Sequence, residues 1–167
     1  FNLPNNYFIV CNQFWPHKNH MAVLKALDFL LQKNKILHIV FTGRYTDERN
    51  KKYVDELKMF ISEKKLGNSL TLTGFISREY QVDLIKNATA VIQPSFFEGW
   101  STVVEDAKAL NKFLIVSDID VNKEQIKNNV LFFDPNDHLK LAMHIDKLNE
   151  EKPHNINFGY EKNIEAS

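Results

Sequence analysis

A glutamate, a glycine and two hydroxyl residues stand together where an apolar run ends and a helical pattern begins. Glu98 and Gly99 occupy a turn, and Ser101 and Thr102 lie where a helix would start. Ser and Thr are favoured at helix N-caps, and the first turn of a helix leaves backbone N–H groups unpaired at the positive end of its dipole. Such a turn binds anions. We therefore expect its amides to hold phosphate, and Glu98 to bind sugar hydroxyls beside it.

A lysine in the loop after the first apolar run is the second candidate for chemistry. Lys18 lies within residues 12–20, directly after the apolar residues 7–11. A lysine over the end of a strand would neutralise a diphosphate as its bond to a sugar breaks. A solvated lysine ahead of a helix is the alternative interpretation.

Six short apolar runs that alternate with helical patterns must position these residues. We expect strands at 7–11, 38–42, 70–73, 90–93, 113–116 and 130–133, and helices at 21–31, 48–65, from Ser77 onward, and at 101–110, 121–127 and 136–149. The hydrophobicity of the runs is continuous, which indicates strands that are covered on both faces. This pattern predicts an α/β fold with a doubly wound, Rossmann-like parallel sheet. Ligands of such sheets bind beyond the carboxyl ends of the strands.

Composition narrows the class of protein. The chain has 167 residues, of which 44% are hydrophobic and 25% charged, and its formal net charge is zero. These values fit one domain and give no sign of a nucleic-acid partner. Cys11 is the single cysteine, which excludes a disulfide framework and favours a reducing compartment. No apolar run approaches the roughly 18 residues of a membrane span. We expect a cytoplasmic protein.

The chain divides into a domain and a tail. We expect residues 1–150 to form one domain and residues 151–167 to form a polar tail or linker. The sequence opens with Phe1 rather than Met, which suggests a piece of a longer protein.

Residues 93–107 resemble the signature of the retaining, nucleotide-sugar-dependent group 1 glycosyltransferases of the GT-B fold. That signature combines Pro-Ser, Glu-Gly, an aromatic residue, and a second carboxylate followed by Ala. The matching positions in this chain are Pro94, Ser95, Glu98, Gly99, Trp100, Asp106 and Ala107. Residues 74–78, Lys18 and Ser117–Asp118 extend the resemblance over most of 7–145.

The resemblance implies roles for these residues. Glu98 and Lys18 would be the catalytic pair, with Glu98 on the donor sugar and Lys18 on the diphosphate. The second carboxylate would bind ribose hydroxyls, and the turn at 74–76 would contact the base through its backbone. The donor-binding set implied in this way is Gln13, Arg44, Gly74, Phe75, Ile76, Gly99, Trp100, Ser101, Thr102 and Asp106.

The sequence departs from the family pattern at two positions. The family usually has an arginine five or six residues before the lysine, where this chain has Asn12 or Gln13; Arg44 is the best replacement. The second carboxylate is usually Glu, but here it is Asp106, with Glu105 as a rival. At about 100° per residue, Asp106 borders the apolar face of its helix and Glu105 points nearly opposite. We therefore expect Glu105 to be solvated.

The resemblance implies the donor-binding half of a hexosyltransferase-like enzyme of polysaccharide biosynthesis. The whole enzyme would move a sugar from a nucleoside diphosphate to a glycan or lipid-linked acceptor with retention. The acceptor would be held by an N-terminal domain absent from this chain, so the fragment alone should be inactive. We expect no cofactor and no metal, since His17 and His20 lack further ligands. Peripheral association of the full-length enzyme with the inner face of the membrane stays open.

Other readings of the same sheet remain. A non-catalytic nucleotide-binding or regulatory domain, or half of a sugar-nucleotide epimerase, would have the same fold. A phospho-receiver module would need acidic residues after the first strand, where Asn12 and Gln13 stand. A dinucleotide-binding domain would need a Gly-x-Gly-x-x-Gly turn at that point, and the sequence has none there.

Overall fold

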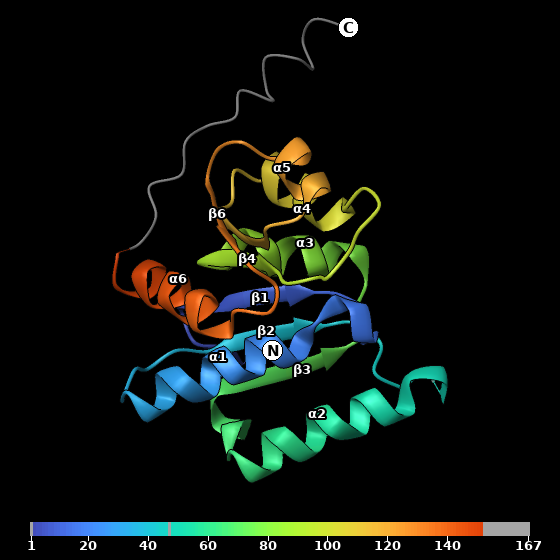
Figure 1. Ribbon diagram of the computed structural model, residues 1–167, viewed down its shortest axis with the longest axis vertical. Coiled ribbons are helices and arrows are strands. Elements are labelled where there is room, and N and C mark those ends of the chain that lie inside the picture. Colours follow the sequence, from blue (N-terminus) through green and yellow to red (C-terminus); the bar gives the residue numbers. More distant parts are fainter. Residues whose placement is uncertain (1, 47, 152–167) are drawn as a thin grey trace, which may run out of the picture.

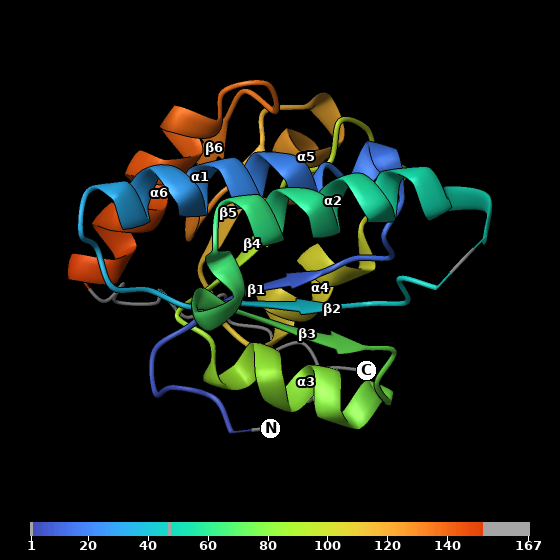
Figure 2. The ribbon, with the colours of Figure 1, turned by 90° about the horizontal axis from the view of Figure 1, so that it is seen from below.

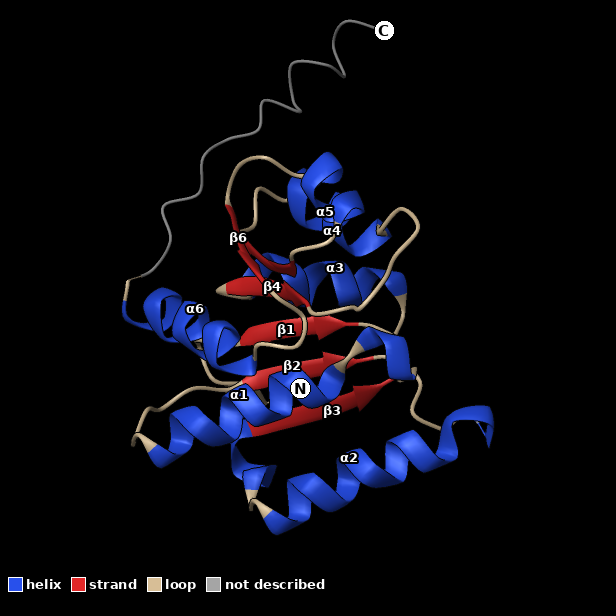
Figure 3. Ribbon diagram, in the orientation of Figure 1, coloured by secondary structure: helices blue, strands red, loops and turns tan. Residues whose placement is uncertain are grey.

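A parallel sheet between two layers of helices makes up the described part of the chain (Figures 1 and 3). The computed structural model describes residues 2–46 and 48–151. The sheet has the strand order β3-β2-β1-β4-β5-β6, and every neighbouring pair is parallel. The predicted doubly wound α/β fold is thus confirmed. The predicted tail lies outside the described residues, apart from Glu151.

Strands and helices alternate along the chain as expected. The strands are β1 (Phe8–Cys11), β2 (Ile39–Thr42), β3 (Leu70–Gly74), β4 (Ala90–Gln93), β5 (Leu114–Ser117) and β6 (Val130–Phe133). The α-helices are α1 (His20–Gln32), α2 (Lys51–Glu63), α3 (Arg78–Asn87), α4 (Thr102–Ala109), α5 (Asp120–Gln125) and α6 (His138–Glu150). Short 3₁₀ turns add η1 (Pro16–Lys18), η2 (Glu48–Asn50) and η3 (Leu66–Ser69).

The central strands are mostly apolar because both of their faces are covered. Phe8 and Val10 of β1 pack into the core beneath α1, α2 and α6, whereas Ile9 and Cys11 pack into the core on the side of α3 and α4. Figure 2 shows α1, α2 and α6 above the sheet and α3 below it. Alternate residues of a strand point to opposite faces, so a strand between two cores needs an uninterrupted apolar run.

The strand order reverses between β1 and β4. The chain runs from β1 outward to β2 and β3, and then returns to place β4 on the other side of β1. Parallel sheets open a crevice at such a switch point, beyond the carboxyl ends of the two strands. The residues after β1 and the residues at the end of β4 therefore lie side by side, and both of the segments singled out for chemistry start there.

Several helix boundaries differ by a few residues from those expected. The helix expected at 48–65 begins as the 3₁₀ turn η2 and becomes α-helical at Lys51, and the helix expected at 121–127 ends at Gln125. Periodicity does not separate a 3₁₀ turn from an α-helix at helix ends. Among the described residues, no helix has the length and apolar character needed to cross a membrane.

Candidate functional site

A pocket of about 350 Å³ opens at the carboxyl ends of β1, β2, β3 and β4. It contains the switch point between β1 and β4. The predicted site residues that line it are Gln13, Lys18, Phe75, Ile76, Glu98, Trp100, Ser101 and Thr102. Asn12, Gln93 and Val103 also line it, whereas Arg44, Gly74, Gly99 and Asp106 are not among its lining residues.

Lys18 and Glu98 form an ion pair in this pocket. Lys18 Nζ lies 2.7 Å from Glu98 Oε1 and 2.8 Å from Oε2. Lys18 ends the turn η1, which Pro16 begins, and Glu98 comes from the loop between β4 and α4. The two side chains are only 15% and 8% exposed. Lys18 is therefore not a solvated lysine, and the two residues predicted to be catalytic meet at one point.

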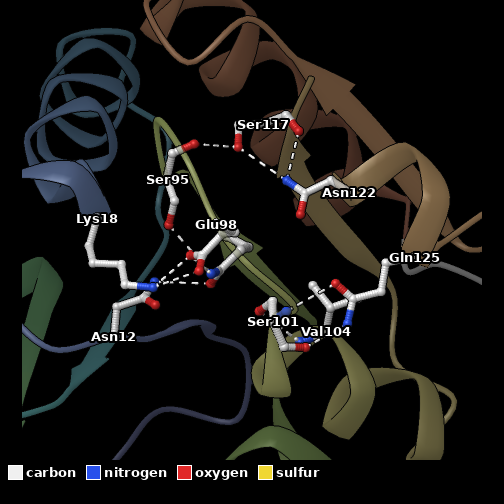
Figure 4. A network of polar contacts seen from close by, with 10 residues as sticks. Asn12, Lys18, Ser95, Glu98, Ser101, Val104, Ser117, Asn122 and Gln125 are labelled. Carbon is white, nitrogen blue, oxygen red and sulfur yellow. Dashed lines mark hydrogen bonds and ion pairs between the residues drawn. The ribbon is translucent and has the colours of Figure 1, made fainter. Parts of the chain in front are cut away.

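Two buried amides extend this pair to the end of β1. Gln93 Nε2 donates to Glu98 Oε1 at 2.6 Å, and Asn12 Nδ2 donates to Gln93 Oε1 at 3.0 Å. Gln93 is 1% exposed. Gln93 was not among the predicted site residues, although a polar residue that ends a buried strand at the carboxyl edge of the sheet is a usable signal. Figure 4 shows the contacts of Asn12, Lys18 and Glu98.

The three residues that could replace the missing arginine have different surroundings in the structure. The Asn12 side chain is buried and bonded to Gln93, and Gln13 Oε1 accepts from the backbone N–H of Arg44 at 2.9 Å. The Arg44 guanidinium lies over the Phe75 ring, 5.4 Å from its centre. Arg44 thus sits at the rim of the pocket beside Phe75, and its role as a replacement stays a prediction.

Glycine brings the loops after β1 and β2 together. Gly43 has φ of 131°, and a Cβ atom there would lie 2.1 Å from the backbone oxygen of Asn12. Only glycine permits this approach. Gly43 N also donates to the Gly74 oxygen at 3.0 Å, which joins the end of β2 to the turn predicted to contact a base. Gly74 has φ of 72°, and Phe75 after it is 69% exposed.

The N-terminus of α4 faces the same pocket. Ser101 caps the helix as predicted, because its Oγ accepts from Val104 N at 3.4 Å. Thr102 and Val103 line the pocket, and their amides have no partner further back in the helix. The expected helix start is thus confirmed, and the binding of phosphate by its amides stays a prediction.

Gln125 of α5 holds this helix end, and sequence reasoning missed it. Its Oε1 accepts from Ser101 N at 3.2 Å, while its Nε2 donates to Ser101 O at 2.7 Å and to Glu105 Oε1 at 2.9 Å. A second buried set supports the preceding loop, because Ser117 Oγ donates to Ser95 O at 2.6 Å and Asn122 Nδ2 to Ser117 O at 2.8 Å (Figure 4). The helix after β5 therefore shapes the site that follows β4.

The two rival acids on α4 have different partners. Asp106 forms a bidentate ion pair with Arg78 at the start of α3, and its side chain is 13% exposed. Glu105 pairs with Lys108 at 3.1 Å, the i, i+3 contact that was expected. The prediction that Glu105 is solvated is wrong, since Glu105 is only 36% exposed and bonds to Gln125. Burial acts to raise the pKa of Glu105, but hydrogen bonds from Gln125 and Lys108 outweigh it and lower the pKa.

The two histidines near Lys18 do not share a site. His17 stacks on Phe97 with ring centres 4.4 Å apart, whereas His20 is buried and stacks on Phe14 at 4.3 Å. Burial lowers the pKa of His20 to about 3. Within residues 2–46 and 48–151, no group of three or more His, Cys, Asp or Glu side chains is arranged to hold a metal ion.

Comparisons with known proteins identify a family for this chain. A family model described as "Glycosyl transferases group 1" matches residues 1–163. The O-antigen chain mannosyltransferase RfbU of Salmonella typhimurium is 30% identical over 132 residues, which are 79% of this chain and 35% of that protein. The chain thus spans about a third of the length of this curated relative.

Solved structures share the fold. A glycosyltransferase from Rickettsia africae superposes with a TM-score of 0.76 at 23% identity, over 87% of this chain and 38% of that one. HepE of Anabaena, in a complex with UDP, gives 0.77 at 21% identity over 88% and 40% of the two chains. Sucrose-phosphate synthase from Thermosynechococcus elongatus gives 0.79 at 20% identity over 90% and 38%. The family match over nearly the whole chain shows that this protein belongs to the group 1 glycosyltransferases.

Proposed function

We propose that residues 1–150 are the donor-binding domain of a glycosyltransferase that transfers a sugar from a nucleoside diphosphate to an acceptor with retention of configuration. The observation that carries the proposal is the convergence of Lys18, Glu98 and the N-terminus of α4 on one pocket at the switch point of the sheet. A cation and helix amides suit a diphosphate, and a buried carboxylate suits sugar hydroxyls.

Each part of the donor has a place in this arrangement. The diphosphate would lie between Lys18 and the amides of Thr102 and Val103, where both offset its negative charge. The sugar would bond to Glu98, and the base would lie at the turn 74–76. Asp106 would bind the ribose, directly or through water, from its position beside Arg78. Gln13, Arg44, Gly99 and Trp100 would complete the walls.

In the reaction, the bond between the anomeric carbon and the diphosphate oxygen breaks while a bond to the acceptor hydroxyl forms. The hydroxyl gives its proton to the departing diphosphate oxygen, and Lys18 and the α4 amides stabilise the negative charge of the leaving nucleoside diphosphate. The free protein holds Lys18 against Glu98, so donor binding exchanges this ion pair for contacts to phosphate and sugar. In this proposal the transfer uses no metal and no cofactor.

Similar proteins support the donor class. HepE has been solved with UDP, with UDP and glucose, and with UDP-glucose. RfbU is named as a mannosyltransferase of the O-antigen chain, which supports a glycan or lipid-linked acceptor. We further propose that a part of the enzyme outside this chain binds the acceptor, that the enzyme is cytoplasmic, and that it associates with the inner face of the membrane to reach a lipid-linked acceptor.

A thermal-shift screen tests the donor site. The chain is mixed in turn with UDP, GDP, ADP and their sugars. A ligand that binds only the folded state raises the free energy of unfolding by RT ln(1 + [L]/Kd), and Tm rises with it. We expect one nucleoside diphosphate and its sugar to stabilise the chain, while acceptor-dependent transfer by residues 1–167 stays negligible because the acceptor is not positioned. If none of the nucleotides raises Tm, the proposed donor site is wrong. If residues 1–167 alone catalyse robust transfer, the proposal that the acceptor is bound outside this chain is wrong. Retention is tested on the full-length enzyme by the anomeric configuration of its product.

A further inference from the structure

The end of β4 carries a buried polar residue that the fold does not need. Ala90, Val91 and Ile92 are fully buried, and Gln93 continues the strand at 1% exposure. A buried amide lowers stability unless both of its groups are hydrogen-bonded, so an apolar residue would be the simpler way to end this strand. Both groups of Gln93 are bonded, to Asn12 and to Glu98. The bonds of Gln93 therefore point to a role in the site.

The chemistry of Glu98 dictates how the amides are oriented. A carboxylate only accepts hydrogen bonds, so the Gln93 atom that lies 2.6 Å from Glu98 Oε1 is its NH₂ group. The oxygen of Gln93 then faces Asn12, which must present its own NH₂ group at 3.0 Å. Asn12 follows β1 and Gln93 ends β4, so this chain of bonds crosses the switch point of the sheet.

The two contacts of Glu98 differ in what happens to them when a donor binds. Lys18 bonds to both carboxylate oxygens in the free protein, but in the proposed function it moves its charge to the diphosphate. Gln93 is itself held by Asn12, and donor binding does not require that bond to break. Once Lys18 turns away, the bond from Gln93 still limits the rotamers of Glu98, whose side chain otherwise has much freedom to lose.

We propose that Gln93 is a positioning residue for the donor sugar: its amide, oriented by Asn12, holds the Glu98 carboxylate in the geometry that binds the sugar hydroxyls. This inference rests on the proposed function of Glu98. Gln93 acts through Glu98 rather than on the substrate, so its loss affects the sugar part of the donor and not the nucleotide part.

The test is the sugar-dependent gain in affinity, defined as Kd of the nucleoside diphosphate divided by Kd of its sugar. Isothermal titration calorimetry on the chain uses GDP with GDP-mannose or UDP with UDP-glucose, whichever pair binds the wild type more tightly. Gln93→Met keeps the length of the side chain without its hydrogen bonds. We expect it to lower the gain by up to about tenfold, the factor for one lost charge-assisted hydrogen bond, while the affinity for the nucleoside diphosphate changes little.

Two comparisons separate positioning from mere stability. In the Glu98→Gln background, Gln93→Met should cause no further loss of the gain, because residues that act as a unit are not additive. Gln125→Met is the matched control, since it removes a buried amide that holds the α4 N-terminus. It should lower the affinity for the nucleoside diphosphate and the affinity for the nucleotide sugar by the same factor. A Gln93→Met variant that behaves like this control overturns the proposal.

A second variant keeps the test decisive if Gln93→Met folds poorly. Asn12→Asp leaves Gln93 in place but turns its NH₂ group toward the new carboxylate and its oxygen toward Glu98. The gain should fall as it does for Gln93→Met, and an unchanged gain overturns the proposal. The Glu98→Gln variant identifies failure of the proposed function itself: if it keeps the full gain, Glu98 does not bind the sugar. If Glu98→Gln loses the gain and both other variants keep it, only the role of Gln93 is wrong.

Discussion

Lys18 and Glu98 are separated by 80 residues along the chain, yet Lys18 Nζ lies within 2.8 Å of both carboxylate oxygens of Glu98. The contact exists because the segments after β1 and after β4 meet at the switch point of the sheet. The cation and the anion of the site are thus each other's partner in this structure, and in the proposed function a bound donor separates them.

Replacement of Lys18 should weaken phosphate binding selectively. Lys18→Ala is expected to cost about 1–3 kcal/mol of binding free energy for a nucleoside diphosphate, the range for a charged group that loses its partner. The nucleoside alone should bind unchanged, because only the phosphates feel this charge. Calorimetric titration of both ligands measures the difference, with Lys52→Ala, an exposed lysine of α2, as the control. Equal losses for nucleoside and diphosphate would show a structural role.

Removal of the charge of Glu98 should affect transfer more than folding. Glu98→Gln keeps the shape of the side chain, and its amide oxygen can still accept a hydrogen bond from Lys18 or Gln93. We expect a large fall in kcat/KM of the full-length enzyme and a small change in Tm. Thermal denaturation and initial rates on the same preparation check this. A variant that unfolds readily but retains its activity would contradict the proposed role.

The two acids of α4 should differ in their effect on ribose recognition. Asp106→Ala is expected to weaken the binding of a ribonucleotide more than the binding of its 2′-deoxy analogue, because the lost contact involves the ribose hydroxyls. Glu105→Ala should affect both nucleotides equally and lower the free energy of unfolding by about 1 kcal/mol, since Gln125 and Lys108 lose a partner. Calorimetry with both nucleotides and urea denaturation decide the matter. A 2′-selective loss for Glu105→Ala alone would reverse the assignment.

His20 should make the protein sensitive to acid. Burial lowers its pKa from 6.5 to about 3, so between these pH values the unfolded chain binds more protons than the folded one. The free energy of unfolding should then fall as the pH falls below 6.5, with a contribution from this group that approaches 1.4 kcal/mol per pH unit. His20→Phe keeps a ring against Phe14 and removes the titration. Urea denaturation from pH 7 to pH 4 should give a flatter curve for the variant, and parallel curves would contradict the prediction.

Local features of the site were predictable because they depend on neighbours in sequence. Ser101 caps α4 since a hydroxyl directly before a helix accepts from an amide three residues on. The six strands could be located because a strand covered on both faces has a nearly continuous apolar run. The family resemblance added roles for Lys18 and Glu98 that spacing alone does not supply.

Errors arose where a distant element covers a residue. The helical phase of α4 placed Glu105 opposite the buried face, but that reasoning treats the helix alone. In the fold, α5 packs beside α4 and its Gln125 reaches both Ser101 and Glu105. Arg78 lies in the segment 74–78 that resembles the family, yet its pairing with Asp106 depends on the contact between α3 and α4. Residues without a sequence neighbour to reveal them, such as Gln125, were missed for the same reason.

By itself, then, the sequence determined the parallel sheet, the helix cap, the glycine turns and the residue types that suit a diphosphate and a sugar. Only the tertiary structure decided which of these residues meet. The hydrophobic periodicity of a strand or helix and the capping of a helix depend on interactions within a few residues of sequence. The strand order β3-β2-β1-β4-β5-β6 depends instead on how whole strand–helix units pack against one another. That order places the end of β1 next to the end of β4, and this single adjacency joins Asn12 to Gln93 and Lys18 to Glu98.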